Sequence, residues 1–137
     1  MDWLYRRSIF DFDSMTDLNK DLRKYLHQNY CLYIPMSTKK EQSSDGTIKW
    51  MIDQGASQAI EAVYIPEKKR GTLCISSQIG CLIDCPFCAT GHQGFNRNLS
   101  SAEIIGQVLL AKQDLQNEFK RDDLITNIVF MGMGEPL

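Results

Sequence analysis

The chain has 137 residues, enough for one domain with a core, and its hydrophobic share of 43% is ordinary for a globular protein. A net charge of −2 excludes a basic surface over the whole chain, so nucleic acid could be bound only by local clusters such as Arg6-Arg7, Lys39-Lys40 and Lys68-Lys69-Arg70. No apolar run approaches the roughly 20 residues that span a bilayer, and no signal peptide is recognisable, so no membrane partner is expected. Five cysteines, three of them clustered, fit a reducing compartment and predict a cytoplasmic protein.

The N-terminal segment is expected to be helical. Its first apolar residues resemble the end of a helix; they are Trp3, Leu4, Tyr5, Ile9, Phe10 and Phe12. A second helix is predicted from a cap at Thr16 to about Asn29. It carries an apolar stripe that should pack into a core, formed by Leu18, Leu22, Tyr25 and Leu26. Cys31 follows, and we expect it to be a small buried side chain.

Residues 34 to 66 predict a small antiparallel meander. Asp45-Gly46 is a turn signal, and strands are expected over residues 47–52 and 59–65. Glu61 lies between Ile60 and Ala62 in the last strand. On this pattern alone, its carboxylate is expected on the solvent face.

The second half of the chain predicts a strand, a helix and another strand. Residues 71–77 read as a strand that leads straight into a cysteine-rich loop. Ser100 and Glu103 match a capping box that starts a helix ending at about Phe119. Its predicted apolar face consists of Ile104, Ile105, Val108, Leu109 and Leu115. A second buried strand is expected over residues 127–131. The order of a strand, a helix and another strand favours parallel pairing of the two strands.

Three cysteines, Cys81, Cys85 and Cys88, are spaced C-x3-C-x2-C. Structural zinc would need a fourth ligand, and His92 is the nearest candidate, although one short loop would then supply every ligand. A four-iron cluster held by three cysteines instead leaves one iron open to a substrate or cofactor. With the aromatic Phe87 before the last cysteine, the spacing resembles the signature of radical S-adenosylmethionine (SAM) enzymes, whose open iron chelates SAM.

A short glycine-containing segment, Gly134-Glu135-Pro136, follows the second predicted strand. In parallel α/β sheets, ligands bind at the carboxyl ends of the strands, so this segment and the cysteine loop should face the same side. Gly134 lets the backbone approach a ligand, and the carboxylate of Glu135 can accept hydrogen bonds from an ammonium group. The segment looks like the radical SAM motif that holds the SAM amino group.

Longer runs resemble one family, the bacterial dual-specificity RNA adenine C2-methyltransferases (RlmN). The matching runs cover nearly the whole chain: residues 43–50, 61–67, 71–81, 94–99, 103–107 and 131–136. The resemblance implies methylation of C2 of an adenine in 23S rRNA and in tRNA, with a [4Fe-4S] cluster, SAM and an electron donor such as flavodoxin. One SAM methylates a cysteine near the C-terminus of such enzymes. The second SAM, cleaved at the cluster, generates a radical on that methyl group, which adds to the adenine.

The resemblance also assigns roles to single residues. Cys81, Cys85 and Cys88 would ligate the cluster, and Phe87, Gly134 and Glu135 would contact SAM. Glu61 matches the position of the proposed acceptor of the C2 proton. Cys74 matches the thiol that releases the methylated RNA from its protein adduct by forming a disulfide bond.

The expected fold is α/β, namely the start of a radical SAM partial (βα)6 barrel preceded by a helical and antiparallel β accessory region. We divide it into an accessory region, 1–66, and the first βαβ portion with the iron-sulfur loop, 67–137. The family pattern continues beyond Leu137, so we expect an incomplete chain that cannot methylate RNA alone. Two alternatives stay open: the sister family that methylates adenine C8, although the run 94–99 favours the C2 enzymes, and a zinc-binding RNA-interaction module without catalysis.

Overall fold

The computed structural model describes residues 2–135 and divides the chain into two compact units, one ending at Ile34 and the other starting at Pro35. The first unit contains helices α1 (Asp2–Tyr5) and α2 (Lys20–Asn29). The predicted helical tail up to Phe12 is therefore wrong beyond α1. Asp11 instead accepts hydrogen bonds from Ser14, which holds this segment in a local turn.

Helix α2 ends where predicted but starts later. Its N-cap is Asn19, whose side chain accepts a hydrogen bond of 2.7 Å from the Leu22 N–H, so the predicted cap at Thr16 is wrong. The predicted core stripe is also wrong, because α2 has no buried residue. Cys31 is exposed rather than buried. Among the described residues of this small unit, only Met15 is buried, as expected of about thirty residues that can form little core.

The second unit is built on a five-stranded sheet in the order β1-β2-β3-β4-β7. The strands are β1 (Ser37–Gln42), β2 (Ile48–Gly55), β3 (Gln58–Pro66), β4 (Gly71–Cys74) and β7 (Asn127–Val129). Strands β1 to β4 pair antiparallel, and β4 pairs with β7 in parallel. The predicted meander and the predicted parallel pairing are both confirmed. The division drawn at residue 66 falls between β3 and β4, which are neighbours in this sheet.

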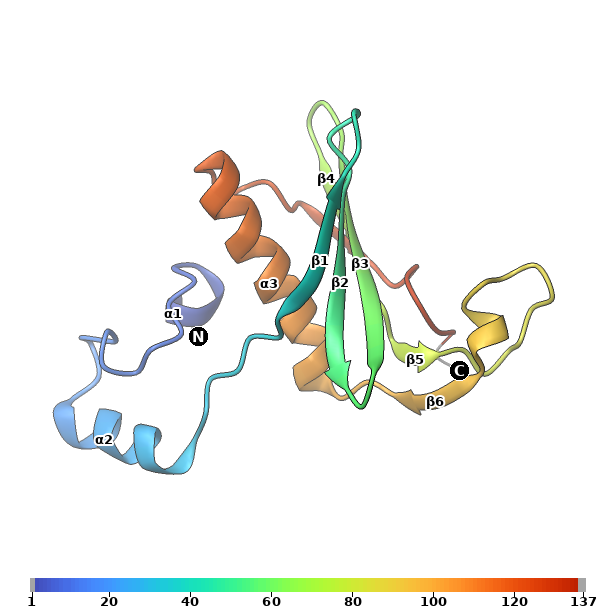
Figure 1. Ribbon diagram of the computed structural model, residues 1–137. Coiled ribbons are helices and arrows are strands. Elements are labelled where there is room, and N and C mark those ends of the chain that lie inside the picture. The colour runs from blue at the N-terminus through green and yellow to red at the C-terminus, as the bar shows by residue number, and fades with distance from the viewer. Residues whose placement is uncertain (1, 136–137) are drawn as a thin grey trace. The chain divides into compact units, whose positions relative to one another are not determined.

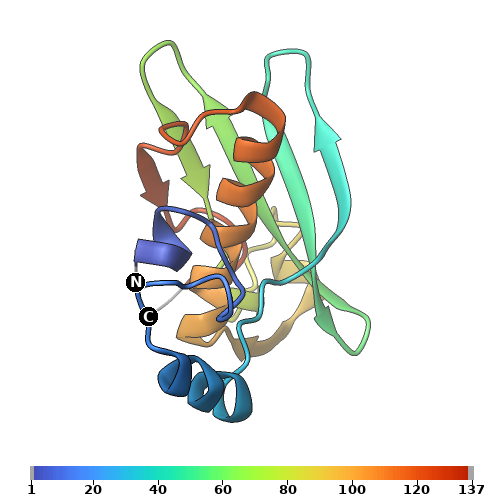
Figure 2. The ribbon, with the colours of Figure 1, turned by 90° about the vertical axis from the view of Figure 1, so that its left-hand side faces the viewer.

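Helix α3 (Ser101–Phe119) covers one face of the sheet and forms the core with it (Figures 1 and 2). Its capping box of Ser100 and Glu103 is present as predicted. The side chains buried on this face of the sheet are Ile48, Trp50, Ile52, Ile60, Ala62, Tyr64 and Leu73. From α3 the core receives Leu109, Leu110, Ala111 and Leu115, whereas the predicted Ile105 is exposed. Burial of each large side chain contributes about 1.5–3 kcal/mol, so this layer stabilises the unit.

The opposite face of the sheet carries the two residues predicted to be catalytic. Glu61 pairs with Met51 across the strands, and Cys74 pairs with Val63. Directly paired residues share a face and residues two apart along a strand share it too, so Glu61 and Cys74 lie on the same side. That side faces away from α3.

A two-stranded hairpin of β5 (Gln78–Gly80) and β6 (Phe95–Asn98) holds the cysteine loop, which contains the short 3₁₀ helix η1 (Gly91–Gln93). The prediction that one strand runs straight into the loop is therefore wrong, since β4 ends at Cys74 and β5 begins after three further residues. Figure 1 shows the hairpin and its loop on the other side of the sheet from α3.

The predicted burial of the strand over residues 127–131 is wrong. The strand β7 covers Asn127–Val129, and Ile128 is 45% exposed. As the last strand in the sheet order it has a described neighbour, β4, on one side. In residues 2–135, no helix combines the length and apolar character needed to cross a bilayer.

Candidate functional site

The cysteine loop is closed at its base by the β5–β6 hairpin. Gln78 pairs with Asn98, and Ile79 pairs with Arg97. The Cys81 N–H then donates to the Gly94 carbonyl over 3.2 Å. Gly80 has φ 72°, and a Cβ at this position would lie 1.7 Å from the Gly94 oxygen, so only glycine allows this close approach. The loop therefore leaves the sheet from a rigid stem.

The three cysteines lie within this loop as free thiols. Cys81 is buried, and Cys85 and Cys88 are partly buried. A turn joins the last two, with the Cys88 N–H 3.0 Å from the Cys85 carbonyl. Backbone N–H groups of Gly91 and then Thr90 lower the pKa of the Cys88 thiol. This environment favours thiolate, the form of cysteine that ligates metals.

Cys81, Cys85 and Cys88 do not form a group whose ligand atoms all lie within 4.8 Å of one another. Tetrahedral zinc with Zn–S bonds of about 2.3 Å would bring its sulfurs to about 3.8 Å from one another. Within residues 2–135, the one group of three ligand side chains whose ligand atoms all lie within 4.8 Å is Asp11, Asp13 and His27, in the first unit. The Nε2 of His92 lies 3.1 Å from the Pro86 carbonyl oxygen, within the loop backbone.

The tip of the loop is apolar and exposed. Phe87 is 89% exposed, and Leu82 and Ile83 are also exposed. Large apolar side chains that are exposed together indicate a surface that contacts another group. Phe87, predicted to contact SAM, therefore lies on the outer surface of the loop.

The segment that carries Gly134 and Glu135 runs along the start of β5. Met133 accepts hydrogen bonds from the Ser77 and Gln78 N–H groups, over 2.8 and 3.2 Å. The Glu135 N–H donates to the side-chain oxygen of Gln78 over 3.2 Å. The negative charge of Glu135 opposes ionisation of the Cys88 thiol and so raises its pKa slightly, against the larger lowering by the loop backbone. The structure thus brings the predicted Gly-Glu segment to the cysteine loop.

A cleft of about 550 Å³ separates the β2–β3 hairpin from the cysteine loop. Glu61 and Met51 line it from the sheet, and Gly94, Phe95 and Asn96 line it from the loop and β6. Glu61 is not simply solvated, because its carboxylate lies 3.2 Å from the Lys49 ammonium. Hydrogen bonds from Lys49 to Glu61 and then to Glu41 raise the pKa of Lys49, so this lysine stays protonated.

Cys74 ends β4 and is partly buried. Burial raises the pKa of its thiol, and a hydrogen bond from the Met131 backbone offsets part of that effect. All five cysteines are free thiols in this structure, so Cys74 is in the reduced form that the predicted disulfide formation would start from.

Four residues of the site were missed by the sequence analysis: Ser76, Ser77, Gln78 and Gln107, which are buried although polar. Gln107 of α3 bonds both backbone groups of Ser76, accepting over 2.8 Å and donating over 2.9 Å. The Ser76 hydroxyl donates to the Glu61 carbonyl over 2.7 Å and accepts from the Met133 N–H over 2.9 Å. A polar run between two buried isoleucines, Ile75 and Ile79, was the available signal.

Comparison with known proteins is consistent with this geometry. Residues 1–32 match the family described as ribosomal RNA large subunit methyltransferase N-terminal domain. Over all of its residues the chain is 55% identical to the dual-specificity RNA methyltransferase RlmN of Halorhodospira halophila. The chain is similar to RlmN over its whole length. RlmN of Francisella tularensis subsp. novicida is 52% identical over 98% of the chain.

The fold agrees with this sequence similarity. A crystal structure of a radical SAM methyltransferase from Sphaerobacter thermophilus matches 98% of the chain with a TM-score of 0.83 and 41% sequence identity. The chain spans 37% and 36% of the two RlmN relatives and 39% of the chain of known structure. Radical SAM methyltransferases use SAM and a [4Fe-4S] cluster, and the cysteine loop supplies a suitable donor set.

Proposed function

We propose that this chain is part of a radical SAM enzyme that methylates C2 of adenine in 23S rRNA and tRNA. One observation carries the proposal: the β5–β6 hairpin presents Cys81, Cys85 and Cys88, and the same hairpin bonds the backbone of Glu135. In this proposal residues 67–137 begin a partial (βα)6 barrel, and residues 1–66 form an accessory region. The enzyme works in the cytoplasm and receives electrons from a donor such as flavodoxin.

The cluster and SAM are assigned to the loop and the segment beside it. Cys81, Cys85 and Cys88 hold the [4Fe-4S] cluster, and Gly134, Glu135 and Phe87 contact SAM. The exposed carboxylate of Glu135 can accept hydrogen bonds from the SAM ammonium group. When bound, the cluster and SAM supply the radical that makes methylation possible at a carbon that is not nucleophilic.

Glu61 is assigned as the base that removes the C2 proton. Its carboxylate lines the cleft on the face opposite α3, which is the side where the cysteine loop lies. A base must reach the proton it removes, so this position matters more than its acidity. The Lys49 ammonium lies 3.2 Å from this carboxylate.

Cys74 is assigned as the thiol that releases the methylated RNA. It shares the sheet face of Glu61 and precedes the cysteine loop in the chain, but it is not among the residues that line the cleft and does not belong to the C-x3-C-x2-C set. A fourth thiolate on the cluster would close the iron that SAM must occupy, which argues against Cys74 as a ligand. Its thiolate is then available to attack the cysteine sulfur that carries the RNA through a methylene bridge, so that an S–S bond forms as the S–C bond breaks and the released carbon takes up a proton to become the methyl group.

Anaerobic reconstitution with iron and sulfide tests the cluster directly. The protein should take up about four irons per chain, and after reduction its electron paramagnetic resonance signal should shift when SAM is added. Stoichiometric zinc without iron would support the zinc module instead. A nucleoside digest of RNA treated with a full-length enzyme that carries this sequence separates the remaining alternatives: 2-methyladenosine is expected, and 8-methyladenosine would assign the sister activity.

A further inference from the structure

The buried polar side chains of residues 2–135 gather in one place. They are Ser76, Ser77, Gln78 and Gln107, and each is at most 7% exposed. Burying a polar group without a partner costs free energy, so such a group is usually retained with its hydrogen bonds satisfied. Ser76 and Ser77 belong to the link from β4 to the cysteine hairpin, Gln78 is the first residue of that hairpin, and the segment 132–135 runs alongside.

Gln78 uses both ends of its side-chain amide. Its oxygen accepts from the Glu135 N–H over 3.2 Å, and its nitrogen donates to the side-chain oxygen of Asn98 over 2.9 Å. Gln78 begins β5, and Asn98 ends β6, where the two residues pair across the hairpin. One buried side chain therefore connects both strands of the cysteine hairpin with the backbone of Glu135.

Gly134 lies directly against the same side chain. It has φ 93°, and a Cβ at this position would lie 2.4 Å from the Cβ and 2.6 Å from the Cγ of Gln78. Its glycine is thus required both by the backbone conformation and by contact with Gln78. The backbone that leads into Glu135 therefore packs directly against the Gln78 side chain.

We infer that Gln78 is a positioning residue for SAM binding, acting through the backbone of Glu135. This inference rests on the proposed function, in which Glu135 bonds the SAM ammonium group. Gln78 itself need not touch SAM: its amide holds the Glu135 backbone at a constant distance from the hairpin that carries the three cysteines. A ligand that bonds both the cluster and Glu135 requires that distance to be kept.

The test replaces Gln78 in a full-length enzyme that carries this sequence. Gln78→Met keeps the length and volume of the side chain but removes both hydrogen bonds. Iron content should stay at the wild-type level, and SAM affinity, measured by equilibrium dialysis with labelled SAM, should fall about tenfold, as expected for loss of one buried hydrogen bond. KM for SAM should rise by a similar factor, while the rate of SAM cleavage at saturation should change less.

Two further variants separate positioning from simple packing. Gln78→Glu keeps an oxygen acceptor for the Glu135 N–H and should recover most of the SAM affinity. Asn98→Ala leaves Gln78 in place but removes the partner that fixes its amide, and it should weaken SAM binding severalfold with iron unchanged. Gln54→Met is the matched control, because the Gln54 amide donates to the neighbouring Asp53 carbonyl on β2, and it should bind SAM normally.

The outcomes distinguish this inference from the proposed function. Wild-type affinity for SAM in both Gln78→Met and Asn98→Ala would overturn the positioning role. Loss of iron in both variants would also overturn it, because the residues would then support the cysteine loop itself. A wild-type enzyme with a complete cluster that binds no SAM would instead refute the proposed function.

Discussion

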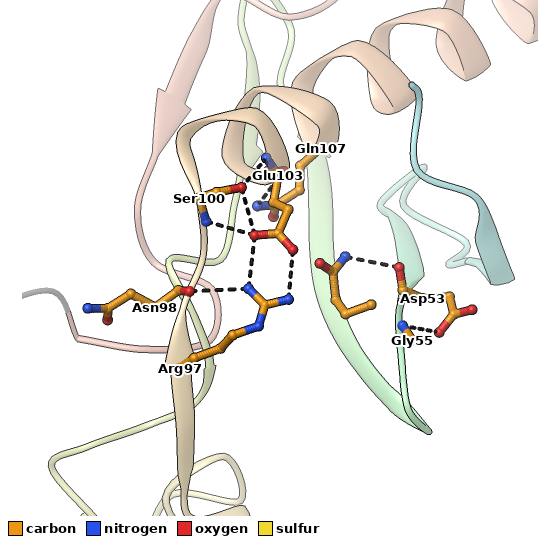
Figure 3. A network of polar contacts seen from close by, with 8 residues as sticks. Asp53, Gly55, Arg97, Asn98, Ser100, Glu103 and Gln107 are labelled. Carbon is orange, nitrogen blue, oxygen red and sulfur yellow. Dashed lines mark hydrogen bonds and ion pairs between the residues drawn. The ribbon is translucent and has the colours of Figure 1, made fainter. Parts of the chain in front are cut away.

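Arg97 and Glu103 form a two-pronged ion pair, with N–O distances of 2.9 and 2.7 Å (Figure 3). Arg97 belongs to β6, and Glu103 lies in the first turn of α3, where it also accepts from the Ser100 N–H. The pair therefore joins the cysteine hairpin to the helix that covers the sheet. The guanidinium of Arg97, which belongs to the run 94–99 that resembles the C2 enzymes, is directed to this structural contact.

The pair predicts a pH dependence of stability. Chiefly through the hydrogen bonds from Arg97, the pKa of Glu103 is lowered from 4.5 to about 2. A lowered carboxylate pKa gives stability that is complete above pH 4.5 and is lost as pH falls toward 2. Since Arg97 is 42% exposed, screening reduces the contribution to about 1–2 kcal/mol.

Urea unfolding of Glu103→Gln measures this contribution. The variant should lose about 1–2 kcal/mol at pH 7 and almost nothing relative to wild type near pH 2. Glu67→Gln is the control, because Glu67 also bonds an arginine with two contacts, but on an exposed turn. An equal loss at both pH values would mean that Glu103 stabilises by packing rather than by charge.

Local patterns predicted much of the fold of the second unit. The capping box at Ser100, the turn at Asp45-Gly46 and the alternation of the meander each depend on neighbouring residues, and the structure contains them all. The sequence-based predictions were wrong where tertiary contacts determine the structure. Leu22 on α2 satisfies the helical period but has no core to enter, and the hairpin of β5 and β6 depends on pairing across the cysteine loop.

The sequence predicted the reactive residues of the candidate site, but it did not predict the buried polar residues that hold the neighbouring backbone in place. Cysteine spacing indicated the loop, and the family resemblance indicated Glu61 and Cys74. Gln78 and Gln107 have no sequence signal of comparable strength, since glutamine is mostly found on protein surfaces. Their burial became visible only with the contact between the start of β5 and the segment before Glu135.

Glu61→Gln should abolish product formation without affecting the cluster. The amide has nearly the same shape but cannot accept the C2 proton, so we expect at least about a 100-fold loss of RNA methylation with iron content and SAM cleavage unchanged. Glu41→Gln is the matched control, because Glu41 also bonds Lys49 over 3.2 Å but lies on β1. Normal turnover by Glu61→Gln would show that Glu61 is not the base and serves only as a structural partner of Lys49.

His92→Ala should leave metal binding intact. The His92 Nε2 lies against the Pro86 carbonyl oxygen, so its loss removes a contact within the loop but no proposed cluster ligand. Iron and sulfide measured after anaerobic reconstitution should equal the wild-type values, whereas Cys88→Ala should lower both. Loss of metal from His92→Ala would favour the Cys3His zinc site.

Cys74→Ala should trap the RNA on the protein. Iron content and SAM cleavage should be unchanged, but without the resolving thiol a covalent protein–RNA species should accumulate on a denaturing gel. Cys31→Ala is the control, because Cys31 is exposed in the first unit. Turnover by Cys74→Ala without an accumulated adduct would show that Cys74 serves only as a strand side chain.

The wild-type adduct should also decay faster at higher pH. Because burial raises the pKa of the Cys74 thiol, only a small fraction is thiolate at neutral pH, despite the hydrogen bond from the Met131 backbone. Below that pKa the thiolate fraction increases about tenfold per pH unit, and adduct release should follow it until the thiol is fully ionised. Following the adduct in a rapid-quench series from pH 7 to pH 9 measures this slope. A release rate independent of pH would mean either that another step limits release or that Cys74 is not the attacking group. The Cys74→Ala variant separates these two explanations: loss of release in this variant would support the first, and normal release would support the second.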